Sequence, residues 1–403
     1  MRFLLTAEQE AFGRSLDALL SAADVPTVTR AWAAGDPAPG HALFARLADA
    51  GLFALAVPEA YGGLGPLPVE LVVAFVELGR HAVPGPLVES VAVLTLLTRL
   101  AAAGDTSAAE RLLPALLAGR PATLALPGEG SYVLDPGAVG ALLVVEPGTT
   151  GTTGTTGTTG TTGTTGTTGT TGTTGTTGPR APTGAGAAVT GAAGARAAGV
   201  GAAGARAVGA GARSAVLRLA PGHGLPRVSA DPARRLARPA PGGEVIATGD
   251  QLGPAAASAA GIARLLTAAQ ALGVGLTLLD RTVAYVGQRR QFGTPVGAFQ
   301  AVKHRLADTM IGLEFARPLV YGAALTLEAA DIAAAKVTAG EAGYAAARAA
   351  LQLHGAVGYT EELDLSLWLR KARPLRDAWG TPGRCRARVL AGVPAPERVV
   401  LGG

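Results

Sequence analysis

The chain has 403 residues, enough for two or three domains, and 48% of them are hydrophobic against 16% charged. Its net charge of +5 comes from scattered arginines without a nucleic-acid-binding motif, so nucleic acid is not an expected partner and no metal site is predicted. The single cysteine, Cys385, excludes an internal disulfide framework and suits a reducing cytoplasm, while charges interrupt the longest apolar runs, so neither a signal peptide nor a membrane span is predicted.

The first 120 residues show the apolar spacing of helices. Thr6, followed by the acidic Glu8, is typical of a helix start, and Leu16 and Leu20 continue the apolar face. Prolines then predict a broken loop over 26–39. Further helices are predicted over 41–50, 67–81, 87–103 and 107–118, so residues 1–120 form an N-terminal helical domain.

Residues 121–250 form a middle β segment interrupted by a low-complexity tract. Strand signals, which are apolar runs between Gly and Pro, occur at 122–126, 141–145, 214–219 and 227–249. Between them lies an uninterrupted Gly-Thr-Thr repeat, followed by an Ala/Gly/Arg tract. Neither offers large side chains to bury, so we expect 148–213 to be disordered or an extended linker.

The last third of the chain is helical in pattern. Alanine-rich helices are predicted over 254–288, 298–328, 330–354 and 362–378. Their Leu, Val and Ala stripes favour packing of these helices against one another in a domain over 251–395. The chain is therefore predicted to be mainly α with a middle β segment.

Four strings resemble the acyl-CoA dehydrogenase family and occur in the order found there. The most informative is RRQFGTPVGAFQ at 289–300. The others are PEAYGGLG at 58–65, DPARRL at 231–236 and QLHGAVGYT at 352–360. The resemblance, to actinobacterial-type members, implies an N-terminal helical domain, a β-domain that is degraded here, and a C-terminal four-helix bundle.

The resemblance also implies FAD as cofactor. Arg289 would contact the pyrophosphate of a neighbouring subunit's FAD, and Gln300 would reach its adenosine side. An arginine fork suits phosphate oxygens. The other residues implied at cofactor sites are Gln291, Phe292, Gln352, Leu353, His354, Gly355 and Thr381.

The catalytic base is missing from both positions where the family places it. Trp379 occupies the position after the last bundle helix and Ala263 the alternative one on the earlier helix, and neither can accept a proton. Asp377 is the nearest carboxylate, but two helical residues rotate a side chain by about 200°, so we expect it to face away. Pro127 also replaces a hydroxyl residue expected at the flavin face.

Three hypotheses follow. The first is the base-lacking subunit of a heteromeric enzyme, completing another chain's FAD site. That enzyme would desaturate an acyl-CoA, with a homologous subunit and an electron-transfer flavoprotein as partners. The second is a self-sufficient homo-oligomer with Asp377 as base. The third is a decayed helical scaffold without cofactor. The sequence does not specify the acyl chain.

Overall fold

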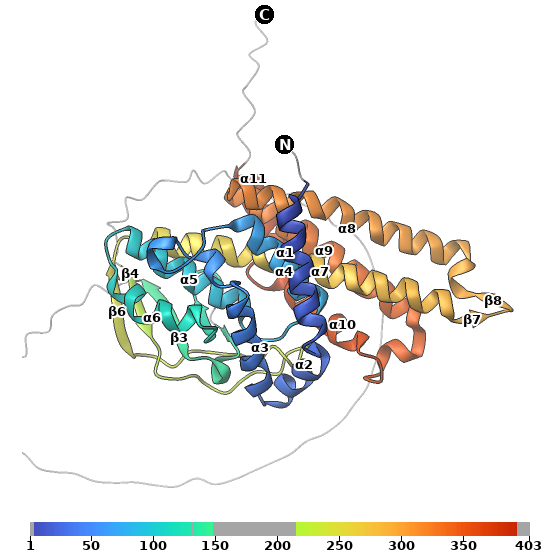
Figure 1. The fold of residues 1–403 in the computed structure, drawn as a ribbon, viewed down its shortest axis with the longest axis horizontal. Helices are drawn as coiled ribbons and strands as arrows, with labels where there is room; N and C mark the ends of the chain where they lie inside the picture. Colours follow the sequence, from blue (N-terminus) through green and yellow to red (C-terminus); the bar gives the residue numbers. More distant parts are fainter. Residues whose placement is uncertain (1–3, 131, 148–214, 393–403) are drawn as a thin grey trace, which may run out of the picture. The chain divides into compact units, whose positions relative to one another are not determined.

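The computed structural model describes residues 4–130, 132–147 and 215–392 (Figure 1). The expected linker at 148–213 and Ser131 lie outside the described residues. The described part contains helical layers around a small sheet. It agrees with the predicted class, mainly α with a middle β segment.

Six helices form the N-terminal part: α1 (Ala7–Ser21), α2 (Val25–Ala34), α3 (Ala38–Asp49), α4 (Pro68–Arg80), α5 (Leu87–Ala102) and α6 (Ser107–Leu117). The predicted cap of α1 is present, because Gln9 N donates to Thr6 Oγ1 and Thr6 N donates to Gln9 Oε1. The α5 helix is buried on nearly every face, so it forms the centre of this layer.

The predicted loop over 26–39 is wrong. Most of it is helix, since α2 and α3 each carry a proline in the first turn, Pro26 and Pro39. The first N–H groups of a helix have no partner within the helix, so proline is tolerated there. The prolines therefore start helices at this point.

The middle segment forms a four-stranded sheet in the order β1-β3-β4-β6. Its strands are β1 (Ala122–Ala125), β3 (Ala141–Pro147), β4 (Ala215–Leu219) and β6 (Glu244–Gly249). The β1–β3 pair is parallel and the other two pairs are antiparallel. A second, two-stranded antiparallel sheet pairs β2 (Val133–Leu134) with β5 (Leu236–Ala237).

The strand expected over 227–249 is shorter than predicted, because only β5 and β6 form within it. Pro239, Pro241, Gly242 and Gly243 lie between these two strands. Proline cannot donate to a ladder and glycine weakens one, so the chain turns there.

The C-terminal bundle contains α7 (Leu252–Gln288), α8 (Gln300–Thr326), α9 (Ala329–His354) and α10 (Leu365–Asp377). A further helix that the sequence analysis missed, α11 (Pro382–Gly392), packs on α9. The hairpin of β7 (Arg290–Gln291) and β8 (Thr294–Pro295) joins α7 to α8, at the end of the bundle away from the sheet (Figure 1).

Helix α7 is the core of the described fold. It touches α4, α5, α8, α9 and α10. At its crossing with α4, a Cβ on Gly273 would lie 2.0 Å from the Val76 carbonyl oxygen, so glycine is required for this approach. By length and hydropathy alone α7 could cross a bilayer, but 89% of its apolar window is buried inside the fold. Burial in the core therefore accounts for its apolarity.

Candidate functional site

A cavity of about 410 Å³ lies where the sheet segment, α5 and the end of α10 meet. Its walls are mainly apolar, and several titratable side chains also line it. Trp379 and Asp377 lie on one wall and Glu89 on another. The remaining lining residues are Leu124, Ala125, Leu126, Glu129, Gly130, Tyr132, Leu134, Ser229, Ala230, Arg234, Leu236, Arg373, Pro374 and Ala378.

Trp379, which the resemblance places at the base position, is held at two points. Its carbonyl oxygen accepts a hydrogen bond from Arg264 Nε at 2.9 Å. Its indole Nε1 donates to Glu89 Oε1 at 3.0 Å. The backbone is left-handed, with φ of 54°, which a bulky residue rarely adopts.

Glu89 is a buried carboxyl that the sequence analysis missed. It is 4% exposed, and burial raises its pKa, although the Arg234 charge and the Trp379 hydrogen bond oppose this. Its second oxygen, Oε2, has no hydrogen-bond partner among the described residues. One signal was present: an acid within the apolar run Leu87–Leu94 should be either paired or functional.

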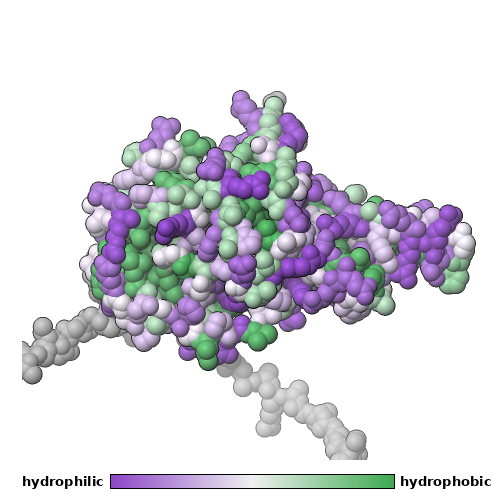
Figure 2. Space-filling model, turned by 60° about the horizontal axis from the view of Figure 1, so that its bottom comes forward, coloured by the Kyte–Doolittle hydropathy of each residue, from purple (hydrophilic) through white to green (hydrophobic). Residues whose placement is uncertain are grey.

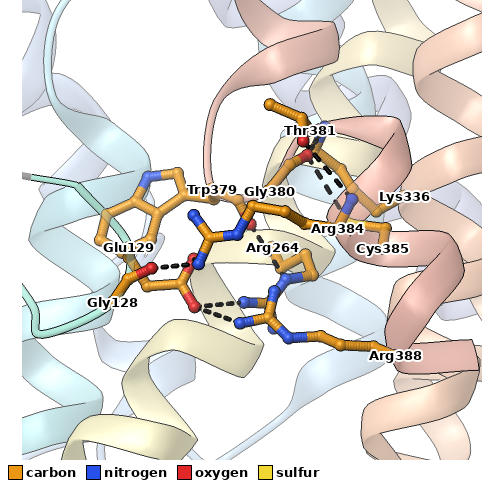
Figure 3. A network of polar contacts seen from close by, with 10 residues as sticks. All are labelled: Gly128, Glu129, Arg264, Lys336, Trp379, Gly380, Thr381, Arg384, Cys385 and Arg388. Carbon is orange, nitrogen blue, oxygen red and sulfur yellow. Dashed lines mark hydrogen bonds and ion pairs between the residues drawn. The ribbon is translucent and has the colours of Figure 1, made fainter. Parts of the chain in front are cut away.

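A network of charges, centred on the buried side chains of Arg264 and Glu129, lies beside Trp379 (Figure 3). Arg264 Nη2 donates to Glu129 Oε1 at 2.9 Å, and Arg388 contacts the same oxygen. Arg384 forms a longer ion pair, 3.9 Å from Oε2. Burial lowers the pKa of Arg264. The carboxylate of Glu129 thus neutralises part of a local excess of positive charge.

Lys336, on α9, is held on the other side of this network (Figure 3). Its Nζ donates to the Arg376 carbonyl oxygen at 2.8 Å and to the Gly380 carbonyl oxygen at 3.5 Å. Burial lowers its pKa to about 8. These bonds fix the turn that carries Trp379 and Thr381 between α10 and α11.

Ala263, which the resemblance places at the alternative base position, is 0% exposed and offers no acid. Asp377, the last residue of α10, is among the residues that line the cavity. Helical rotation does not apply between Asp377 and Trp379, because α10 ends at Asp377 and Trp379 is left-handed. The expectation that the Asp377 side chain faces away stays a prediction. The Asp377 side chain is 44% exposed and lies 3.4 Å from Arg376 Nη1.

The predicted dinucleotide residues gather at the opposite end of the bundle. Arg289, at the end of α7, donates from Nη1 to Tyr285 Oη at 2.6 Å and to the His354 carbonyl oxygen at 3.0 Å. The His354 ring stacks on Tyr285 with centroids 4.2 Å apart, and burial lowers its pKa. Gly355 follows with φ of 65°, which favours glycine.

The hairpin residues of this set point into solvent. Phe292 is 93% exposed, and its ring meets that of Phe299 at 6.4 Å. Gln291, Gln300 and Gln352 are exposed, and Leu353 is half-buried. The bundle end that carries the hairpin presents a mostly polar surface, whereas hydrophobic residues gather on the side of the sheet (Figure 2).

Thr381 does not join this set. It precedes α11 beside Gly380, whose carbonyl oxygen receives the Lys336 bond near the start of α9. Arg289 contacts His354 at the end of α9. At about 1.5 Å per residue, the helix between Lys336 and His354 spans roughly 27 Å. The dinucleotide set and the Trp379 cavity are therefore separate places on one chain.

One further group of possible ligands occurs in the described part of the chain. Asp17, Glu77 and His81 bring ligand atoms within 4.8 Å of one another. Arg80 lies 3.8 Å from Glu77 Oε1, and His81 Nε2 lies 2.8 Å from Asp17 Oδ1. A guanidinium beside the carboxylates already neutralises charge there, which disfavours a bound cation.

Comparisons with known proteins give consistent matches. A model described as acyl-CoA dehydrogenase, N-terminal domain, matches residues 6–120, and one described as acyl-CoA dehydrogenase, C-terminal domain, matches 254–393. Acyl-CoA dehydrogenase IpdE2 of Mycolicibacterium smegmatis is 36% identical over 168 residues, or 42% of this chain. The match spans about half, 52%, of that relative's length.

Solved structures show the same fold. Butyryl-CoA dehydrogenase from Megasphaera elsdenii has a TM-score of 0.68 at 19% identity, covering 97% of this chain and 99% of that one. The ChsE4-ChsE5 complex from Mycobacterium tuberculosis has a TM-score of 0.65 at 21% identity, covering 98% and 100%.

Proposed function

The chain belongs to the acyl-CoA dehydrogenase family, and on this basis we propose that it is one subunit of a complex that desaturates the Cα–Cβ bond of an acyl-CoA. In this proposal the chain is the non-catalytic partner. Its Arg289, Gln300 and Gln352, called the Arg289 set below, complete the FAD site of a related, base-bearing subunit. An electron-transfer flavoprotein accepts the electrons.

The observation that carries the proposal is Trp379 at the family's base position. Removal of the weakly acidic Cα proton needs a group that can accept it. An indole whose N–H is already donated to Glu89 cannot do so, and neither can the Ala263 methyl group. In the proposal, this chain therefore binds and orients the cofactor, while the base-bearing subunit supplies the proton acceptor.

The dinucleotide set fits the phosphate-bearing part of FAD. Both side-chain hydrogen bonds that Arg289 makes within the described residues come from Nη1, so Nη2 and Nε stay available for phosphate oxygens. Gly355 brings backbone to the same place, and Gln300 lies exposed at the first turn of α8. Bound FAD supplies the hydride acceptor for Cβ. The residues of this chain bind the phosphate-bearing part of FAD and orient it.

The stretch of α9 between Lys336, which contacts the turn after α10, and His354, which contacts Arg289, spans about 27 Å. This separation supports sharing of the cofactor between subunits. The outer face of α8 supplies a surface for a partner. Ile311, Phe315 and Leu319 recur at helical spacing and are 49%, 70% and 43% exposed. A related subunit with an equivalent bundle is the proposed occupant, and the two-component ChsE4-ChsE5 complex shows that its own chains assemble.

A second candidate is a self-sufficient homo-oligomer with Asp377 as base. The observation that favours it is that Asp377 lines the cavity and is partly exposed. A carboxylate there could accept a proton from a thioester in the cavity. Under this alternative, Asp377→Asn abolishes turnover and leaves bound flavin unchanged.

Purification of the chain alone, followed by mixing with a base-bearing relative, tests the proposal. We expect colourless, inactive protein alone, and a yellow complex that reduces an electron-transfer flavoprotein after mixing. Yellow, active protein from this chain alone would contradict the proposal and favour Asp377. Failure to bind any relative would favour a scaffold without cofactor.

A further inference from the structure

The Trp379 side chain lines the cavity, and its backbone adopts a conformation that its surroundings impose. Its left-handed φ of 54° is unfavourable for a bulky residue and persists only where neighbouring groups determine it. Arg264 holds the carbonyl oxygen, which fixes the backbone. The ring packs against the hydrophobic core, and a second polar contact would fix its orientation.

Glu89 provides that second contact. It lies on α5, in the N-terminal layer, and its Oε1 accepts the indole N–H at 3.0 Å. A carboxyl that is only 4% exposed and leaves Oε2 without a partner is costly to bury. An apolar residue at this position would pack into α5 at less cost. The bond to Trp379 is the specific interaction that this buried carboxyl makes.

We infer that Glu89 is a positioning residue that fixes the Trp379 indole across this chain's own acyl cavity and so closes it to a CoA thioester. The inference rests on the proposed function, in which this chain's cavity does not turn over substrate. A thioester bound there would need to reach the position that the indole covers. The Glu89–Trp379 hydrogen bond thus prevents acyl-CoA from binding in this chain's cavity, so that it binds only to the base-bearing subunit.

The inference is tested on the chain alone, without flavin or partner, by two measurements. Acrylamide quenching of the Trp379 emission, taken as the difference from Trp379→Phe, reports whether the ring is held. Titration with octanoyl-CoA reports whether the cavity is open. Neither needs the reconstituted complex, so failure of reconstitution and failure of this inference are distinguishable.

Glu89→Leu removes the acceptor and should raise both quenching and octanoyl-CoA affinity, the latter by up to about tenfold, which is the range of one hydrogen bond. Glu89→Gln retains an acceptor oxygen and should behave as the wild type. The inference would be overturned if Trp379 in Glu89→Leu were quenched no more than in the wild type. It would also be overturned if Glu89→Leu and Glu89→Gln gained octanoyl-CoA affinity equally.

Trp379→Phe removes the donor of the same hydrogen bond. This second variant tests the inference if Glu89→Leu does not fold. Trp368→Phe is the matched control, since the Trp368 indole donates to the Arg80 carbonyl oxygen at 2.8 Å. We expect octanoyl-CoA binding to tighten in Trp379→Phe alone. Equal affinities in the two variants would overturn the inference.

Discussion

Arg289 Nη1 donates a hydrogen bond to the His354 carbonyl oxygen, 3.0 Å away, and so joins the end of α7 to the end of α9. The His354 ring also stacks on the ring of Tyr285, which accepts the other Nη1 hydrogen bond of Arg289. The arginine is therefore oriented before any ligand arrives, with its Nη1 beside Gly355. Such preorganisation lowers the entropic cost of binding an anion.

Arg289→Lys should weaken FAD retention in the reconstituted complex by roughly tenfold or more, because lysine keeps the charge but loses the planar fork. FAD remaining after gel filtration measures this. Arg290→Lys, at the adjacent hairpin residue, is the matched control and should retain FAD as the wild type does. Equal retention in both variants would remove Arg289 from the site.

Glu129→Gln should lower the free energy of unfolding by about 3–5 kcal/mol, since it leaves buried arginine charge without its counterion. The affected partner is chiefly Arg264, whose side chain is 5% exposed. Urea denaturation measures the change. Glu244→Gln breaks the solvent-exposed pair with Arg111 and should shift the midpoint much less. Similar shifts would show that the buried network does not stabilise the fold.

Stability should fall as pH rises from about 4.5 to about 7, in part because of Glu77. Burial raises its pKa from 4.5 to about 7, with Arg80 opposing. The folded chain then binds more protons than the unfolded chain in this window, and raising the pH favours unfolding. The slope should be smaller in Glu77→Gln and unchanged in the exposed Glu10→Gln. An unchanged slope in Glu77→Gln would contradict the raised pKa.

Phe315→Ser should reduce assembly with the base-bearing subunit, because it removes the largest exposed apolar side chain of the α8 face. Analytical ultracentrifugation of the mixture measures this. Leu390→Ser, at an equally exposed residue of α11, is the control and should assemble normally. Normal assembly of Phe315→Ser would place the partner on another surface.

The sequence predicted most of the fold, because long periodic helices carry strong signals. The bundle helices α7 to α10 lie close to their predicted ranges. The loop predicted over 26–39 was wrong because proline both breaks helices and begins them, and only the surrounding packing distinguishes the two. The missed α11 is short and rich in arginine.

The site was less predictable, since its residues come from distant segments. Trp379 was identified through its motif, but Glu89, which contacts it, lies 290 residues away in the chain. The rotation argument for Asp377 assumed a continuous helix, whereas α10 ends at that residue. Local periodicity carries no information on contacts between α5 and the turn after α10.

In the proposed complex, the Arg289 set of this chain contacts an FAD that another subunit holds. Native mass spectrometry of the complex reconstituted with a base-bearing relative tests it most directly, by counting FAD molecules against chains. The account predicts one FAD for each pair of unlike chains, and its loss in the Arg289→Lys complex. One FAD for every chain, unaffected by Arg289→Lys, would contradict it.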